Sequence, residues 1–191
     1  RRRFCGQYPD IEFRQFEHTQ SGLIEGLRSA TLDVALTYDL AIPADLRFRP
    51  LMTLPPYVLV SDTHALAKAR SVSPRDLAGL PMVLLDLPLS ADYFMSILEK
   101  AGQPPRIVER TRDMAVMQSL VANGFGYSLA NMPPVSRRSP DGKKLRVIPL
   151  TGCPRALRMG LLQSNDAKPS LTLKAFGDHC AKHLQALPVP K

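Results

Sequence analysis

Residues 121–134, VANGFGYSLANMPP, place two glycines between a helical apolar pattern and a short apolar run, and this order decides the kind of α/β fold. A dinucleotide-binding loop needs its glycines between a strand and a following helix, so that the phosphate meets the helix N-terminus. Here Gly124 ends a helix that opens at Asp113, and Gly126 leads into the strand YSLA. The free groups at a helix C-terminus are carbonyls, which repel phosphate. The stretch therefore predicts a helix-to-strand connection without a phosphate site.

Within this stretch, the string GYSLA around Ser128 is similar to the G-x-S-x-G pattern of a nucleophilic serine. Such a serine needs a strand, a sharp turn and a helix around it. Ser128 falls inside the expected strand, so we interpret it as a small core residue. Pro133 and Pro134 then favour the start of one further helical turn.

Upstream, the chain alternates strand and helix patterns. Residues 11–17 (IEFRQFE) begin with alternating apolar and polar residues after a Tyr-Pro-Asp turn, and they predict a strand. Thr19 or Ser21 then caps a short amphipathic helix. Residues 33–38 are the next expected strand, so the three elements form a β-α-β unit.

The alternation continues to the end of the chain. Further strands are expected at 46–52, 55–61, 82–86, 106–110, 127–130, 145–149 and 157–164, and further helices at Ser73–Asp76, 90–101, 113–123 and about 169–185. Strands that alternate with helices indicate a parallel-sheet α/β architecture. Two similar β-α-β blocks, 11–38 and 82–110, suggest two lobes that face a cleft.

The composition is that of a globular chain, with 191 residues of which 45 % are hydrophobic and 22 % charged. No apolar run approaches the roughly 20 residues of a membrane helix. The first residues, RRRFCGQYPD, lack the apolar region and cleavage site of a secretory signal. The three cysteines are far apart and form no CxxC pair. We therefore expect a cytoplasmic protein with no membrane partner and no disulfide framework.

Much of the net charge of +8 comes from residues 137–158, which contain several basic residues and a single acidic residue, Asp141. The basic residues are Arg137, Arg138, Lys143, Lys144, Arg146, Arg155 and Arg158. This stretch is a candidate anion-binding face. A solvated loop-and-strand surface is the alternative, because no aromatic residues interleave the charges as a stacking platform would need.

The sequence shows no catalytic constellation: no paired carboxylates at helical spacing, no nucleophile with a credible base and no P-loop. His179 and His183 form an i, i+4 pair that could hold a metal, but no acid lies between them as in HExxH. We therefore predict no catalytic residues, no cofactor and no metal site, and a protein that is not an enzyme.

In their order, the motifs resemble the effector-binding domain of LysR-type bacterial transcriptional regulators. The resemblance rests on YPDIEFRQFEHT with the helix after it, LDVALTYD, YVLVSDTHALA, SVSPRDLAGLPMVLLD, QPPRIVERTRDMAVMQSLVANGFGYSLANMPP, and the terminal strand and helix. It covers nearly the whole chain, and the succession of motifs carries it rather than any one of them.

The resemblance implies the fold of type 2 periplasmic binding proteins, with two Rossmann-like lobes joined by two crossover strands. Lobe I would comprise 1–61 and 163–191, and lobe II 62–162. Because the family's domain normally begins with a strand and a full helix before YPDIEF, the domain is expected to be N-terminally truncated. A small-molecule effector would bind between the lobes, and promoter DNA only through a winged helix-turn-helix domain that this chain lacks.

Several strand ends open onto helix N-termini, whose free N–H groups favour a carboxylate effector. The candidate ligand-binding residues are Thr19, Gln20, Thr37, Leu87, Ser90, Thr111, Arg112 and Asp113. Thr19, Ser90 and Asp113 are also expected to cap their helices, so ligand contact would be additional to capping. Two other classes stay open on this fold: an exported solute-binding protein that feeds a transporter, and an enzyme with a positioned acid, base or cofactor lysine.

The helix 90–101 is expected to lie in a subunit interface. Its apolar residues, Tyr93, Phe94, Met95, Ile97 and Leu98, surround more of the helix than one core-facing stripe can cover. The resemblance implies a homodimer in which 90–101 and 106–110 meet the segments 1–7 and 11–17 of a second copy, and a tetramer of the full-length protein. Burial of both helix faces within the same chain is the alternative.

Overall fold

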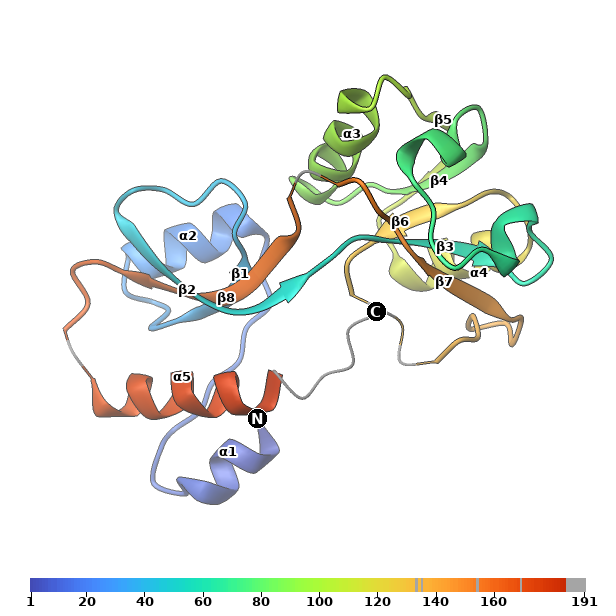
Figure 1. Cartoon of the computed structure of the whole chain (residues 1–191). Helices are drawn as coiled ribbons and strands as arrows, with labels where there is room; N and C mark the ends of the chain where they lie inside the picture. The colour runs from blue at the N-terminus through green and yellow to red at the C-terminus, as the bar shows by residue number, and fades with distance from the viewer. Residues whose placement is uncertain (133, 135, 154, 169, 185–191) are drawn as a thin grey trace. The chain divides into compact units, whose positions relative to one another are not determined.

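The structure is a computed structural model that describes residues 1–132, 134, 136–153, 155–168 and 170–184 (Figure 1). These residues form two compact units. The first contains Arg1–Thr53 and the described residues from Arg158 onward, and the second contains Leu54–Leu157. The chain therefore passes into the second unit at 53–54 and returns to the first at 157–158.

The first unit is built on a three-stranded sheet. Its elements are α1 (Arg2–Gln7), α2 (Gln20–Arg28), β1 (Ala35–Tyr38), β2 (Leu46–Leu54), β8 (Leu157–Ser164) and α5 (Leu171–Leu184), and Leu54 and Leu157 are the end residues that belong to the second unit. The strand order is β1-β8-β2, and β1 pairs antiparallel with β8 so that Thr37 lies opposite Gly160. At Gly160 a Cβ would lie 2.3 Å from the Arg49 carbonyl oxygen, so the two backbones approach as only glycine allows.

An aromatic cluster joins α1 to α5. The buried ring of Phe4 lies 5.2 Å from the ring of Phe176 and 5.3 Å from that of His179. Phe13 adds a third phenyl ring, 5.6 Å from Phe176. The predicted C-terminal helix is thus confirmed as one that docks through its apolar face.

The prediction of a strand at 11–17 was wrong. These residues carry no strand assignment, and the sheet of the first unit offers them no pairing partner among the described residues. A β-pattern forms a strand only where a neighbour completes its backbone hydrogen bonds. The alternation instead leaves Phe13 partly buried, with its ring 6.1 Å from that of Phe4, and Phe16 56 % exposed.

The second unit holds two sheets that are bridged at Met82 and Tyr127. Its elements are β3 (Tyr57–Ser61), η1 (Ala65–Lys68), η2 (Pro74–Leu77), β4 (Pro81–Leu85), α3 (Ser90–Lys100), β5 (Arg106–Thr111), α4 (Met114–Ala122), β6 (Ser128–Ala130) and β7 (Leu145–Pro149). The orders are β6-β3-β7 and β4-β5, and the bridge between Met82 and Tyr127 is parallel. The strands and α-helices of this unit lie where the sequence predicts them, the Ser73 helix is a short 3-10 turn, and the 3-10 turn η1 was not predicted.

The expectation of purely parallel sheets was wrong, because the pairing is mixed. β4 and β5 are parallel, whereas β3 pairs antiparallel with both β6 and β7. A parallel pair needs a crossover connection, which α3 supplies between β4 and β5. Between β3 and β4 the chain reverses through η1 and η2 without a full helix, so β3 runs opposite to β4, β5 and β6.

Two helices bury the two faces of the strands of the second unit. Along β3, Val58 and Val60 belong to one core cluster, while Tyr57 and Leu59 belong to another. The first cluster includes the buried residues of α3, and the second includes those of α4. Because side chains alternate across a strand, α3 and α4 cover opposite faces. This double burial explains the nearly continuous apolar sequence of β3 and β4.

The connection at 121–134 has the predicted form. Gly124 follows α4 with φ +84°, and the N–H of Tyr127 donates to the Pro81 carbonyl at 2.9 Å as β6 begins. Ser128 is buried in β6, as expected of a core residue. Pro133, at which a further helical turn was expected, lies outside the described residues.

The apolar residues of α3 pack within the chain. Phe94, Ile97 and Leu98 are buried, and Tyr93 and Met95 are partly buried against the same core. The Tyr93 hydroxyl also donates to the Arg155 carbonyl at 2.7 Å. The inference that α3 carries apolar surface with no place in its own chain was therefore wrong, and dimerisation stays a prediction on other grounds.

Among the described residues, no helix combines the length and the apolar character that crossing a membrane requires.

Candidate functional site

Three of the predicted ligand-binding residues meet in the first unit, at the N-terminus of α2. Thr19 caps the helix, and its Oγ1 accepts from the Gly22 N–H at 3.3 Å. The N–H groups of Gln20 and Ser21 have no acceptor among the described residues. Because these groups carry the positive end of the helix dipole, they can donate to an anion.

The third residue of this group, Thr37, lies in β1 and is fixed against α2. Its hydroxyl donates to the Gln20 side-chain oxygen, and the Gln20 Nε2 donates to the Leu40 carbonyl at 3.1 Å. Ala41 follows with φ +46°, a left-handed conformation that is unfavourable for a residue with a Cβ. Strain of this kind gathers at functional sites, where the surrounding structure enforces it.

The other five predicted residues gather in the second unit. β4 and β5 are adjacent and parallel, with Leu85 opposite Thr111, so their carboxyl ends meet at one edge of the sheet. There the Asp86 N–H donates to the Thr111 carbonyl at 2.8 Å. Leu87 and Ser90 follow β4, Thr111 is the last residue of β5, and Arg112 and Asp113 follow it. In α/β folds this edge is where ligands bind.

Ser90 does not cap α3, contrary to the prediction. Leu89 holds the N-cap position with φ +63°, and no side chain closes the first turn. The N–H groups of Ser90 and Ala91 donate instead to the carbonyls of Pro88 and Leu87. The local Leu-Pro-Leu turn thus takes over the capping, which the sequence rule for serine does not foresee. Leu89 is the second strained residue beside a predicted ligand contact.

Asp113 caps α4 as predicted. Its Oδ1 accepts from Ala115 N at 2.7 Å and from Val116 N at 3.2 Å, while its own N–H donates to the Thr111 hydroxyl. The carboxylate therefore already occupies the N-terminus of α4 and would repel a second carboxylate there. Within this group, the exposed Arg112 guanidinium and the Ser90 hydroxyl are better placed by their chemistry to meet an anion.

Sequence reasoning did not identify the ion pair that fixes the end of β1. The buried Asp39 carboxylate accepts from the N–H and the Nε of Arg158, each at 2.8 Å. Arg158 is the first residue of the first unit after the return passage. The acid is visible in the motif LDVALTYD, but its partner lies 119 positions away in the sequence. Burial also raises the pKa of the neighbouring Tyr38.

The described residues hold no group of three potential metal-ligating side chains. The rings of His179 and His183 stack at 4.1 Å, and His183 Nδ1 lies 2.9 Å from the His179 carbonyl oxygen. Burial first, and then the neighbouring cations, lower the pKa of His179. The two rings thus stack along α5, and the His179 ring also contacts Phe4.

These elements make up a mixed α/β fold that solved effector-binding domains share, among them that of BenM, at 17 % identity and a TM-score of 0.81. The model of the LysR substrate binding domain family matches residues 2–185, and the chain belongs to this family. The family consists of regulator domains and not of enzymes.

Named relatives agree with this assignment. The chain is 29 % identical over 139 residues to the HTH-type transcriptional regulator BsdA of Bacillus subtilis, which covers 70 % of this chain and 48 % of that protein. It is 29 % identical over 180 residues to IlvR of Caulobacter vibrioides, with 89 % and 58 % covered. The crystal structure of HinK, a LysR family transcriptional regulator from Pseudomonas aeruginosa, superposes with a TM-score of 0.90 at 31 % identity, and covers 96 % of this chain and 64 % of that one. The chain spans about half the length of BsdA, the first of these relatives.

Proposed function

We propose that the chain is the effector-sensing domain of a LysR-type transcriptional regulator and binds a small carboxylate between its two lobes. Binding would control the attachment to promoter DNA of a winged helix-turn-helix domain outside this chain. The regulator would act in the cytoplasm, as a homodimer of this domain and a tetramer of the full-length protein. The lobe limits, 1–61 with 163–191 and 62–162, are part of this proposal.

The first turn of α2 is the observation that carries the proposal. Two free N–H groups, those of Gln20 and Ser21, lie beside the hydroxyls of Thr19 and Ser21, which are 3.0 Å apart. Together they form a set of neutral donors at the positive end of a helix, which suits one carboxylate without a counter-charge. In the second unit, Arg112 would supply a cation and Ser90 a hydroxyl.

Domains of the same fold support the chemical class of the effector. The effector-binding domain of QuiR was solved in complex with shikimate, at 21 % identity and a TM-score of 0.78, and that of BenM with benzoate, at 17 % and 0.81. Both of these effectors are carboxylates. At this identity the likeness concerns the fold, so the choice among carboxylates is left to experiment.

Isothermal titration calorimetry on this chain tests the proposal. A thermal-shift screen of aromatic and aliphatic carboxylates identifies a binder, and the variant Thr19→Val is then titrated with it. We expect affinity to fall about tenfold, since one hydrogen bond contributes about 1–1.5 kcal/mol. Recovery of the ligand unaltered, by mass spectrometry, is expected as well.

Thr172→Val is the matched control, because Thr172 is an exposed threonine of α5 in the same unit. Its affinity should equal that of the parent chain, and circular dichroism should show both variants folded at the titration temperature. Equal affinities for the parent and Thr19→Val would remove Thr19 from the site. Multiple turnover of the ligand would contradict a sensor and indicate an enzyme.

A further inference from the structure

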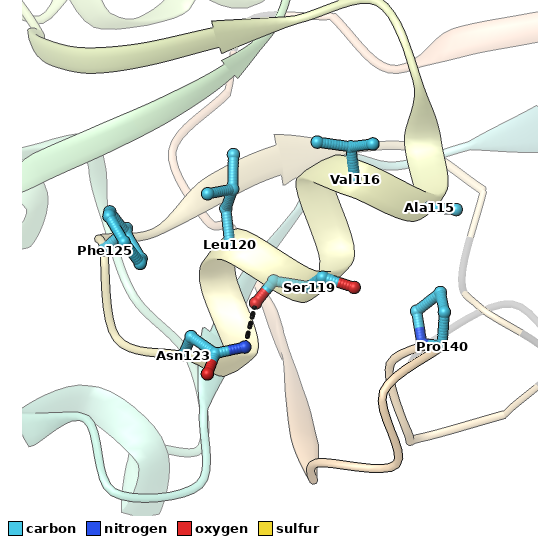
Figure 2. Close-up of a pocket in the computed structure, with 7 residues that line it drawn as sticks. All are labelled: Ala115, Val116, Ser119, Leu120, Asn123, Phe125 and Pro140. Carbon is cyan, nitrogen blue, oxygen red and sulfur yellow. Dashed lines mark hydrogen bonds between the residues drawn. The ribbon is translucent and has the colours of Figure 1, made fainter.

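The outer face of α4 carries a hollow of about 320 Å³ that none of the predicted ligand-binding residues lines. Figure 2 shows its two sides: one face of α4 with Phe125 just beyond the helix end, and Pro140 on the facing loop. The lining residues are Ala115, Val116, Ser119, Leu120, Asn123, Phe125 and Pro140. All of them belong to the second unit.

Of the large apolar side chains that line this hollow, Leu120 also packs against the core, whereas Val116 and Phe125 are absent from the core clusters. Met117 and Val121 form the face of α4 that is buried against β3 and β4. The side chains of Val116 and Phe125 lie outside this buried face and are 47 % and 50 % exposed. Ala115, Ser119 and Asn123 follow one another at i, i+4 spacing, so the hollow runs along a turn-by-turn stripe of the helix. The exposed apolar side chains of Val116 and Phe125 therefore form a second apolar surface beside this stripe, outside the core-facing side of α4.

The rim of the hollow is basic. Lys143 Nζ contacts the Asn123 side-chain oxygen, and Arg138 Nη1 donates to the Gly142 carbonyl at 2.7 Å. Arg137, Lys144 and Arg146 are exposed on the same loop and on β7.

The acid within this loop is already engaged. Asp141 accepts from the Ser139 hydroxyl at 2.6 Å and from the Asn123 amide at 2.8 Å. The hydrogen bond from Ser139, and then that from Asn123, lower the pKa of this carboxyl to about 2. The loop therefore presents its cations to solvent, and Lys143, which contacts Asn123, lies at the edge of the hollow.

We propose that this hollow is a docking site for an amphipathic helix of a partner protein, with an apolar face for the hollow and acidic residues along its flanks. Apolar anchors at helical spacing fit such a groove, and opposite charge at the rim fixes orientation and speeds association. A second copy of this chain fits poorly, because it carries a net charge of +8 and would bring like charge to a basic rim. The basic stretch at 137–146, for which the sequence left two interpretations open, becomes part of a recognition surface.

The test uses this chain and a fluorescein-labelled synthetic helix with leucines at i, i+3, i+4 and i+7 and glutamates beside them. Fluorescence anisotropy should show binding that weakens as salt is added. The variant Val116→Gln/Phe125→Gln should lose at least about tenfold in affinity, and Lys143→Gln/Lys144→Gln about threefold or more. A helix with lysines in place of the glutamates should bind at least about tenfold more weakly.

Two matched variants control for nonspecific effects. Leu171→Gln removes an apolar side chain that is 86 % exposed in the first unit, and Lys68→Gln/Lys100→Gln removes two exposed lysines of the second unit away from the hollow. Both should bind like the parent chain, and amide chemical shifts should move on α4 and at 137–144. Equal binding of the lysine helix, or unchanged binding by Val116→Gln/Phe125→Gln, overturns the proposal. Self-association of the parent chain that this double variant abolishes assigns the hollow to a second copy and overturns it too.

Discussion

Gly126 and Ser128 lie two positions apart where the chain passes from α4 into β6. At both positions, close packing with neighbouring atoms limits the size of the side chain that fits. A Cβ on Gly126 would lie 2.2 Å from the Pro81 carbonyl oxygen. The Ser128 Oγ is buried and has no hydrogen-bond partner among the described residues. Position 126 therefore has room only for glycine, and position 128 tolerates a buried hydroxyl that makes no hydrogen bond.

Gly126→Ala should destabilise the chain by about 2–4 kcal/mol, because the new methyl group would push against the β4 backbone. Gly124→Ala is the matched control, since Gly124 also has positive φ but has no atom within 4 Å of a Cβ. Its cost should be about 1 kcal/mol, from backbone strain alone. Urea denaturation of the three chains checks this, and equal losses for both variants would contradict the close approach to Pro81.

Ser128→Ala should leave stability unchanged or raise it by about 1 kcal/mol, because it removes a buried hydroxyl that makes no hydrogen bond. Ser139→Ala gives the contrast. Ser139 is also buried, but its hydroxyl donates to Asp141 at 2.6 Å, so its loss should cost about 1 kcal/mol. Thermal unfolding of the parent chain and of each variant measures both changes in stability. A larger loss for Ser128→Ala than for Ser139→Ala would reveal a partner of Ser128.

At the scale of elements, the helices begin in two different ways. α2 and α4 start at the predicted side-chain caps, Thr19 and Asp113. α3 starts one residue before its serine, at the left-handed Leu89. A cap therefore depends on whether the preceding turn leaves N–H groups for the side chain to accept.

Asp113→Ala should lower the free energy of unfolding by about 1 kcal/mol, because two N–H groups of α4 lose their acceptor. Ser90→Ala should change it by only a few tenths of a kcal/mol, since Ser90 is already inside the helix. Chemical denaturation without ligand separates this role from any role in binding. A loss of about 1 kcal/mol for Ser90→Ala would restore Ser90 as the cap.

At the scale of the whole molecule, two segments without a strand partner are candidates for the predicted contact between copies of the chain. Residues 11–17 have a strand pattern without a ladder, and Phe16 is exposed among them. β5 pairs with β4, and among the described residues no strand lies on its other edge. Exposed edges and apolar side chains of this kind favour association. They support the predicted homodimer better than the apolar residues of α3 do.

Val108→Arg on β5 should convert the dimer to a monomer without unfolding it, because Val108 is 39 % exposed and contributes little to the core. Sedimentation velocity at concentrations well above micromolar measures the change. Phe125→Arg, at a 50 % exposed apolar residue of the α4–β6 connection outside the predicted interface, should leave the dimer intact. A parent chain that sediments as a monomer would contradict the interface.

The sequence by itself determined the features that depend on neighbours along the chain. The helix starts at Thr19 and Asp113, the Ser73–Asp76 turn and the stop at Gly124 were predictable, because a cap and its N–H groups lie within three or four residues. The same local signals placed most of the predicted ligand-binding residues at strand ends and helix starts, and their contact with a ligand stays a prediction.

Only the tertiary structure decided what depends on residues that are distant in the sequence. The segment 11–17 lacks a strand because no neighbour completes its ladder, and β3 runs against β4 because the chain reverses between them. The pairing of Asp39 with Arg158, and of Thr37 with Gln20, joins atoms that only the folded sheet brings together. Backbone and side-chain hydrogen bonds across such separations form only when the whole unit folds, so no local pattern encodes them.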